Sequence, residues 1–501
     1  MSTMVTRRFF IGGAVSFGAL AGCGLLRRPH SFKVGETPRL RFGVVSDVHV
    51  RLAMDRVSLF EGYDTTTFER ALVWFRDQGV DAVMLCGDMA DKGFHEELSA
   101  VAAAWWKVFP DDRAPDGRHV ERLFVTGNHD WEGWRYQDYG RKIFPDAREL
   151  DRHKLSLDYV GWWRKAFHED YARIFRRAVK GYDFVGAQWD GAGYRGSDEI
   201  GVRGVPEFFA AHGKSFDPSK PFFFFQHPHP KNTCYGPWAW GHDDGETTRA
   251  LSPFANAIAF SGHSHYSLTD ERSIWQGAFT SVGASSLRYG VMTAEPIGIG
   301  GYENSHAPDK TLDRFKLMER IHGSDCRQGM LVSVYDDCVT YARREFLTGD
   351  ALGDLWVQPL SAADSKPFAF AAHAARCTAP EFPAGAKVTC REIVARTRGP
   401  DAKQKAQGVD FPSVEKAALE IAFPAATEAG RVFDYEVSCG GKRKFVVAEG
   451  FNFARTNPRA RRPMTCVFGK DELSTGCLSV KVTPRNSFFR RGAALHCEIQ
   501  I

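Results

Sequence analysis

The sequence lacks a strong excess of charge of either sign. Its 65 Lys and Arg residues nearly balance its 61 Asp and Glu residues, so the formal net charge is only +4 over 501 residues. Two of those positive charges, Arg7 and Arg8, lie in an amino-terminal segment that we expect to be removed. A dedicated nucleic-acid-binding protein needs a strongly basic surface, and the composition argues against this class.

Long apolar runs are also scarce. After the first 22 residues, no run approaches the roughly 20 residues that a membrane-spanning helix requires. No internal repeat is evident, which argues against a solenoid or a repeat array. A chain of 501 residues is therefore expected to form two or three globular domains, at about 150 residues each.

The amino terminus carries the one apolar run. Arg7 and Arg8 precede a glycine-rich apolar stretch, 11–22, which resembles a twin-arginine export signal and is too short to span a membrane. The stretch ends in Leu20-Ala21-Gly22-Cys23, which resembles a lipobox and predicts cleavage before Cys23 and lipidation of its thiol. An ordinary cleavable signal with a chance cysteine is the alternative.

These features predict a signal peptide over 1–22 and a linker over 23–38. The expected partners are the twin-arginine export machinery and a membrane, reached through the lipid on Cys23. We expect an exported protein on the periplasmic or cell-surface side of that membrane.

Most of the cysteines lie in the last third of the chain. Of the 11 cysteines, eight follow residue 320, and an even number in an exported segment permits disulfide bonds. Spacing does not reveal which would pair. We expect one or two bridges at most.

Strand-like and helix-like segments alternate in the first two thirds. Each buried strand-like run is followed at once by polar residues that can bind metal. Loops at the carboxyl ends of parallel strands converge, so these residues are expected to form one site. The five motifs are Asp47-Val48-His49, Gly87-Asp88, Gly127-Asn128-His129-Asp130, His227 and Gly262-His263-Ser264-His265.

Two other regions bear on the site. Residues 131–201, rich in aromatic and basic side chains, are predicted to be a mostly helical insertion that caps it. The loop 231–249 follows His227 and is the better candidate for a substrate wall. Its wall residues would be Tyr235, Trp238 and Trp240, together with His229, which precedes the loop.

The character of the chain changes after about residue 343. Short alternating runs separated by Gly, Pro and Asn predict β-strands over 431–437, 444–447, 464–468, 477–482 and 495–501. We expect a C-terminal all-β sandwich-like domain of immunoglobulin or fibronectin type over 346–501.

The five motifs, in their order, resemble those of the calcineurin-like metallophosphoesterase family. The resemblance implies an α/β fold, a four-layer α/β/β/α sandwich, over 39–345. It also implies two divalent metal ions, and none of the ligands is a thiolate, which suits Mn²⁺, Fe or Zn²⁺. The implied ligands are Asp47, His49 and His265 for one ion, Asn128, His227 and His263 for the other, and Asp88 as the bridge.

The same resemblance implies hydrolysis of a phosphate ester by a metal-bridging hydroxide, with His129 as the general acid. Asp130 is expected either to orient the His129 ring or simply to cap a turn. Asp91 stands three residues after Asp88, where purple acid phosphatases have tyrosine, and this favours the phosphodiesterase branch. The alternatives are a phosphomonoesterase or nucleotidase of the same fold, and a surface protein that binds through its β-sandwich.

Overall fold

The structure is a computed structural model of the chain. The helices and strands described below lie in 37–50, 64–133, 159–190, 201–236, 239–290, 327–360, 366–396, 414–427, 432–448 and 463–501. The predicted signal peptide, Cys23 and Trp238 lie outside these described residues. Within them, no helix is both long and apolar enough to cross a membrane.

The first sheet has six strands in the order β14-β13-β12-β1-β2-β3. Strands β1, β2 and β3 run parallel, whereas β12 pairs antiparallel with β1 and continues into the β13 and β14 meander. The strands are β1 (Leu40–Val45), β2 (Ala82–Cys86), β3 (Glu121–Val125), β12 (Gln328–Val334), β13 (Cys338–Glu345) and β14 (Trp356–Pro359).

The second sheet also has six strands, in the order β10-β11-β9-β8-β5-β4. Its four central strands run parallel, and an antiparallel strand lies at each edge. The strands are β4 (Ile174–Val179), β5 (Tyr182–Ala187), β8 (Phe222–Phe225), β9 (Ala257–Ser261), β10 (Ile274–Gln276) and β11 (Thr280–Gly283).

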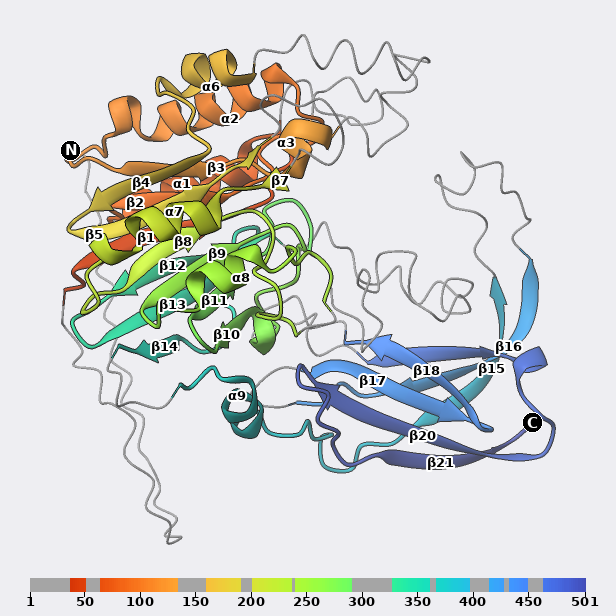
Figure 1. The fold of residues 1–501 in the computed structure, drawn as a ribbon. Helices are drawn as coiled ribbons and strands as arrows, with labels where there is room; N and C mark the ends of the chain where they lie inside the picture. The colour runs from red at the N-terminus through yellow and green to blue at the C-terminus, as the bar shows by residue number, and fades with distance from the viewer. Residues whose placement is uncertain are drawn as a thin grey trace, which may run out of the picture. The chain divides into compact units, whose positions relative to one another are not determined.

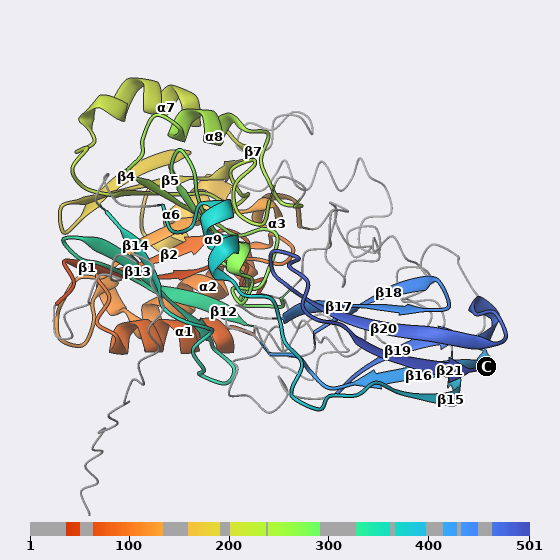
Figure 2. The same ribbon diagram turned by 90° about the horizontal axis from the view of Figure 1, so that it is seen from below.

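The two sheets pack face to face and helices cover both outer faces. Figure 2 shows the layers in turn, from α7 (Val205–His212) and α8 (Glu246–Leu251), through the two sheets, to α1 (Thr66–Asp77) and α2 (His95–Val108). Separate hydrophobic clusters fill the three interfaces between these layers. The predicted four-layer α/β/β/α sandwich is confirmed.

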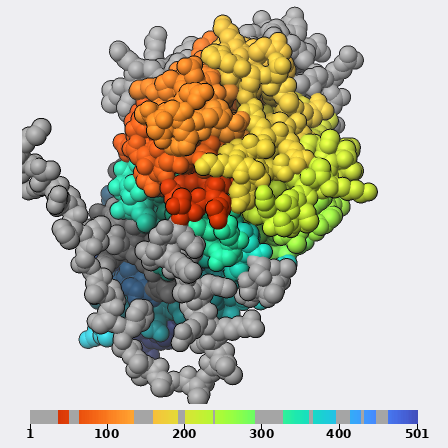
Figure 3. Space-filling view, turned by 90° about the vertical axis from the view of Figure 1, so that its left-hand side faces the viewer, coloured from red at the N-terminus to blue at the C-terminus, as the bar shows by residue number. Residues whose placement is uncertain are grey.

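Phe42 on β1 is a central contact between the two sheets. Its ring packs edge-on against Phe184, Phe223 and Phe260 of the second sheet, with centroid distances of 5.2, 4.9 and 5.8 Å. In Figure 3 the red atoms of the first described residues are bordered by orange, yellow and teal atoms from later parts of the chain. Strand β1 pairs with β2 along one edge and with β12 along the other, so the loop that follows it starts from a rigid base.

The predicted cap over 131–201 is wrong in its described part. Helix α6 (Tyr159–Phe167) is present, but β4 and β5 follow it and belong to the second sheet. Lys180 and Gly181 make the two-residue turn of this hairpin, both with positive φ, at 51° and 79°. Such a turn suits the twist of paired strands, and the Lys-Gly dipeptide was the signal for it in the sequence. A short strand pair, Trp189–Asp190 with Gly201–Val202, follows.

The last part of the chain forms two further sheets around their own hydrophobic core. All five β-runs predicted there are strands, and β15 and β16 precede them (Figure 1). One sheet has the order β15-β16-β19 and the other β18-β17-β20-β21. The strands are β15 (Thr389–Arg396), β16 (Glu415–Phe423), β17 (Val432–Cys439), β18 (Lys442–Val447), β19 (Met464–Gly469), β20 (Cys477–Asn486) and β21 (Leu495–Gln500).

The first sheet extends past residue 345, where we placed the domain boundary. Strand β14 pairs with β13 through Cys338–Pro359 to Tyr341–Trp356, and α9 (Phe370–Arg376) comes next. Trp356 is buried and its indole donates a hydrogen bond to Glu271 (2.8 Å). The short, mixed pattern of this strand concealed it in the sequence.

Candidate metal centre

Each of the five motifs lies just beyond the carboxyl end of a strand. Asp47 follows β1, Asp88 follows β2, and His227 follows β8. Asn128 and His129 begin the short helix α3 (Asn128–Glu132) after β3, and the Gly262–His265 loop follows β9. The packed sheets thus bring together residues that are up to 218 positions apart, from Asp47 to His265.

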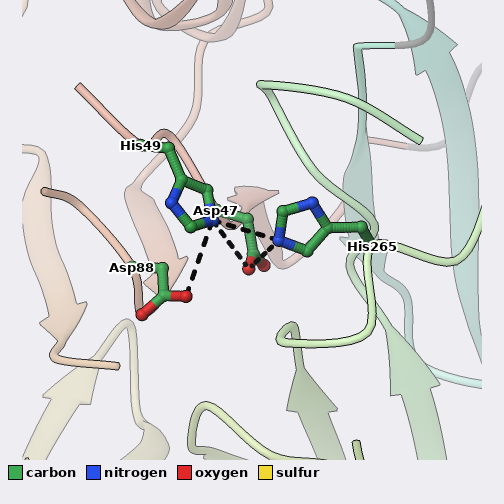
Figure 4. A group of neighbouring side chains, drawn as sticks. All are labelled: Asp47, His49, Asp88 and His265. Atoms are coloured by element: carbon green, nitrogen blue, oxygen red, sulfur yellow. Dashed lines mark hydrogen bonds and ion pairs between the residues drawn. The ribbon is translucent and has the colours of Figure 1, made fainter. Parts of the chain in front are cut away.

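The first group of donor atoms comprises Asp47, His49, Asp88 and His265, all buried. Figure 4 shows their side chains pointing toward one another. His265 Nε2 lies 2.8 Å from Asp47 Oδ1 and 3.0 Å from His49 Nε2. His49 Nε2 is 3.5 Å from Asp88 Oδ2. One ion could contact all four side chains.

The second group comprises Asp88, His227 and His263. His227 Nε2 is 3.1 Å from Asp88 Oδ2 and 3.1 Å from His263 Nδ1. The amide oxygen of Asn128 lies 3.0 Å from the same His227 nitrogen. Asp88 is common to both groups, which is the arrangement expected of a bridging carboxylate.

The tautomers of the histidines suit metal binding. Nδ1 of His227 donates to the Cys86 carbonyl (2.7 Å), and Nδ1 of His265 faces the Tyr289 carbonyl (3.2 Å). Nδ1 of His49 faces the Asp91 carboxylate at 3.3 Å. When the rings are neutral, as metal ligands must be, these contacts leave the Nε2 lone pairs facing carboxylate oxygens, among them the buried Asp47 Oδ1. Opposed lone pairs repel, so the donor set fits a cation.

The backbone at the site is held in a costly conformation. Asp47, His49, Asp88, His263 and His265 all have positive φ, between 44° and 68°. A non-glycine residue in this region costs roughly 1–3 kcal/mol and persists only where the surroundings impose it. Strain at five of the predicted ligands indicates that the loops are shaped for the site.

Two motif glycines leave room for the carboxylates. A Cβ on Gly262 would overlap Ser46 Oγ and Asp47 Oδ2, and a Cβ on Gly127 would overlap Asp88 Oδ1. Gly262 also lies in a tight loop, in which the His263 amide donates a hydrogen bond to Asp47 Oδ2 (3.1 Å). Because Gly127 and Gly262 have no side chain, the backbone can approach the carboxylates closely. This explains why glycine precedes Asn128 and His263 in the motifs.

The charges in the site are strongly coupled. Burial would raise the pKa of Asp47, but His265 and His49 outweigh it and hold the pKa well below its usual value. Burial lowers the pKa of His49 and His227, yet the carboxylates raise these pKa values to about 10 and about 9. The protons on His49 and His227 supply positive charge where a metal ion would bind. A metal ion must displace these protons, so the affinity for metal should increase as pH rises.

His129 lies beside both groups of donor atoms. Its ring centroid is 4.5 Å from that of His49, and its backbone amide donates to Asp88 Oδ1 (2.8 Å). Its Nδ1 donates to the Asp91 carbonyl (2.8 Å), which fixes the orientation of the ring. Burial lowers the pKa of His129, with the charge of His49 acting in the same direction.

The contacts of Asp130 match the turn-capping alternative. Its carboxylate accepts the backbone amides of Gly127 (2.8 Å), Ala90 (2.7 Å) and Met89 (3.3 Å), and so joins the β2 and β3 loops. The Asp91 carbonyl makes the orienting contact to the His129 ring that we had assigned to Asp130. Asp130 therefore stabilises the conformation of the loops that follow β2 and β3.

The predicted substrate wall is only partly exposed. Tyr235 is 1% exposed and its hydroxyl donates to the Tyr266 carbonyl (3.2 Å), so it supports the loop from inside. His229 is also 1% exposed and bonds Ser261 and Ser264, each at 2.6 Å. Trp240 is 38% exposed and stacks on His263, with ring centroids 4.5 Å apart. Trp240 alone among these three is placed to meet a substrate.

Three residues that contact the site were not predicted from the sequence to have a role in it. Asp91 orients both His49 and His129, and its place three residues after Asp88 was the available signal. The Tyr289 ring lies 4.2 Å from that of His265, and the Trp189 ring lies 6.0 Å from that of His263. No sequence signal identifies these two, since neither lies in a motif.

The chain is similar to known proteins over part of its length. Residues 40–267 match the family model of the calcineurin-like phosphoesterases. A dimetal phosphatase from Danio rerio is 12% identical over 65% of this chain and 100% of its own, with a TM-score of 0.36. A purple acid phosphatase from yellow lupin (Lupinus luteus) seeds is 13% identical over 64% of this chain and 54% of its own, with a TM-score of 0.34. No curated protein matches the chain.

The family match covers just under half of the chain. Residues 40–267 are similar to the calcineurin-like phosphoesterases, a family of hydrolases that act on phosphate esters, and the Asp and His cluster in these residues could bind metal.

Replacement of the shared carboxylate tests the site. Asp88→Asn should lose most of its bound metal and its activity, because one amide cannot supply negative charge to both groups of donors. Metal content per chain would be measured by mass spectrometry, with circular dichroism to show that the fold persists. Asp77→Asn, whose side chain is 57% exposed on α1, is the matched control and should change neither. Full metal content and activity in Asp88→Asn would refute the bridging role.

Proposed function

We propose that this protein hydrolyses a phosphodiester with two divalent ions of Mn, Fe or Zn. One observation carries the proposal: Asp88 belongs to two groups of donors at once. Asp47, His49 and His265 would complete the first ion's ligands, and Asn128, His227 and His263 the second's. Two bound ions would lower the pKa of the attacking water and offset the charge of the phosphoryl oxygens.

The charge balance supports an anionic substrate. Two divalent ions carry four positive charges, and Asp47 and Asp88 return two negative ones. The further carboxylate, Asp91, is paired with Lys92 (2.5 Å), so it does not cancel the excess. The remaining ligands are neutral histidines and an amide, which leave a net positive site for a phosphate.

His129 is proposed as the general acid. The Asp91 carbonyl fixes its ring through Nδ1, and its Nε2 would pass a proton to a departing alkoxide. Its lowered pKa means that the protonated form grows as pH falls. The contribution of His129 should therefore be largest on the acidic side and decline as pH rises through that pKa, below about 6.5.

A diester is favoured over a monoester by two features. Asp91 stands where purple acid phosphatases have tyrosine. Trp240 and Tyr289, at 38% and 36% exposed, contact one ligand of each metal group and offer apolar faces to the second ester group of a diester. Phosphomonoesters, including nucleotides, are the second candidate, and a screen of matched mono- and diesters with the metal-loaded protein decides between them.

We also propose that the protein is exported and held to a membrane. The support is the Arg7-Arg8 pattern and the Leu20-Ala21-Gly22-Cys23 sequence. A single acyl chain binds membranes weakly, so stable anchoring implies more than one chain on the modified cysteine. The partners would be the export machinery and the lipid bilayer.

The general acid is tested with two leaving groups. His129→Ala should lose about 10²–10⁴-fold in kcat/KM on an alkyl diester, because alkoxide is a poor leaving group that needs a proton. An activated aryl diester should lose much less, and the acidic-side advantage on the alkyl diester should vanish. Both rates would be measured across pH at equal metal content, with the surface variant His119→Ala as control. Equal losses on both esters would leave His129 only a positioning role.

The substrate wall is tested at Trp240. Trp240→Ala should raise KM about tenfold for a diester with an aromatic group and change it little for a dimethyl ester, since stacking requires a flat partner. Trp240→Phe keeps an aromatic face and should retain most of the affinity. Steady-state kinetics at equal metal content provide the measurement. The same KM change for both esters would show that Trp240 acts only by supporting His263.

The anchor is tested by cell fractionation. Cys23→Ser should move the protein from the membrane to the soluble exported fraction, because serine lacks the thiol that is acylated. Cys477→Ser alters an exposed cysteine and is the matched control. A mature amino terminus elsewhere in the wild type, or an unchanged membrane fraction in Cys23→Ser, would contradict the lipobox interpretation.

A further inference from the structure

The two C-terminal sheets carry cysteines in matching rows. In one sheet, Ile421 on β16 pairs with Cys390 on β15 and with Cys466 on β19. In the other, Val480 on β20 pairs with Cys439 on β17 and with Cys497 on β21. Each row thus has an aliphatic residue between two cysteines. Such matching positions would bring cysteines together in pairs if the rows faced each other.

The rows do face each other across the sandwich core. Ile421, Val480, Cys439 and Cys466 are all 0% exposed and belong to one hydrophobic cluster, against which Cys390 and Cys497 pack. The sulfur atoms of Cys390 and Cys497 are 3.7 Å apart. Figure 2 shows their strands, β15 and β21, at the same flank of the sandwich.

We propose that Cys390 and Cys497 form a disulfide bond that joins the two sheets in the oxidised protein. Each thiol gives up one proton and one electron, an S–S bond forms, and a disulfide-bearing oxidant such as oxidised glutathione is reduced to two thiols. The sulfur atoms must approach from 3.7 Å to about 2.0 Å, which a modest rotation of the two side chains supplies.

Proximity and partial exposure together distinguish this pair from the other described cysteines. Cys390 and Cys497 are partly exposed, so a soluble oxidant reaches them. Cys439 and Cys466 are buried and therefore protected. Burial, together with the adjacent Cys497, raises the pKa of the Cys390 thiol to about 12, so thiolate is scarce at neutral pH and closure is slow without a catalyst.

A metal site is the competing explanation for clustered cysteines. Sulfur atoms around a shared zinc ion also lie within about 4 Å of one another. In the described part of the chain, however, every group of three or more donors that could hold an ion lies in the catalytic centre. The sandwich offers a pair of sulfurs, which suits a bridge.

The bond would close a long loop. Cys390 and Cys497 are 107 positions apart and lie on the first and last strands of the sandwich. A cross-link of that length restricts the unfolded chain strongly, so the oxidised protein should unfold about 5–15 °C higher than the reduced protein. The bridge would thus stabilise the sandwich in an oxidising compartment.

The test oxidises the purified full chain with a glutathione redox buffer at mildly alkaline pH. Free thiols would be blocked by alkylation, and the unreduced digest would be mapped by mass spectrometry. We expect one cross-linked peptide pair that contains Cys390 and Cys497, with the rise in unfolding temperature. Cys390→Ser and Cys497→Ser should each abolish both, whereas Cys477→Ser should abolish neither.

Three results would overturn the proposal. The first is full alkylation of Cys390 and Cys497 after oxidation of the folded protein. The second is a bridge from either of them to Cys439, Cys466 or Cys477. The third is zinc bound at these cysteines, shown by metal that Cys390→Ser releases and Asp88→Asn retains. Because single serine variants could pack less well, peptide mapping of the wild type decides the question independently of their stability.

Discussion

The carboxylate of Asp88 is the contact on which the rest of the catalytic centre depends. It belongs to both groups of donor atoms, accepts the His129 amide (2.8 Å) and lies 3.1 Å from His227 Nε2. To reach this position its backbone takes a positive φ of 53°, and Gly127 must lack a side chain. A single buried carboxylate thus constrains the backbone on two loops.

The two packed sheets supply the rigidity that this constraint requires. Phe42 and the phenylalanines around it hold β1 between the layers, and the loops that carry the ligands leave from strands buried on both faces. Strained loops persist only when their ends cannot relax. Asp130 strengthens this arrangement, because its carboxylate joins the backbone amides of the β2 and β3 loops.

The centre is bordered by aromatic rings, and each contacts a predicted metal ligand. Tyr289 lies over His265, while Trp240 stacks on His263. In the proposed function, the positive charge of the site would bind the phosphate, and these rings would contact the groups esterified to it. Recognition of the ester groups would then be separate from recognition of the phosphate.

The sequence by itself determined the fold class, and it predicted the candidate metal ligands that the structure brings together. Buried strands such as Ala82–Cys86 are short apolar runs, and the polar residues that follow them are local features that need no tertiary knowledge. The C-terminal strands β17 to β21 were predicted for the same reason, since the alternation of apolar and polar residues is a property of each segment by itself. Only tertiary structure decided which hydrogen-bond partners the site residues take and which wall residues are exposed. Asp91 rather than Asp130 orients His129, Tyr235 is buried and Trp240 is not, and 174–187 form a hairpin that pairs with β8 through β5 instead of forming a cap. These outcomes depend on contacts between segments that are far apart in the chain. A local sequence pattern does not reveal the energies of such contacts.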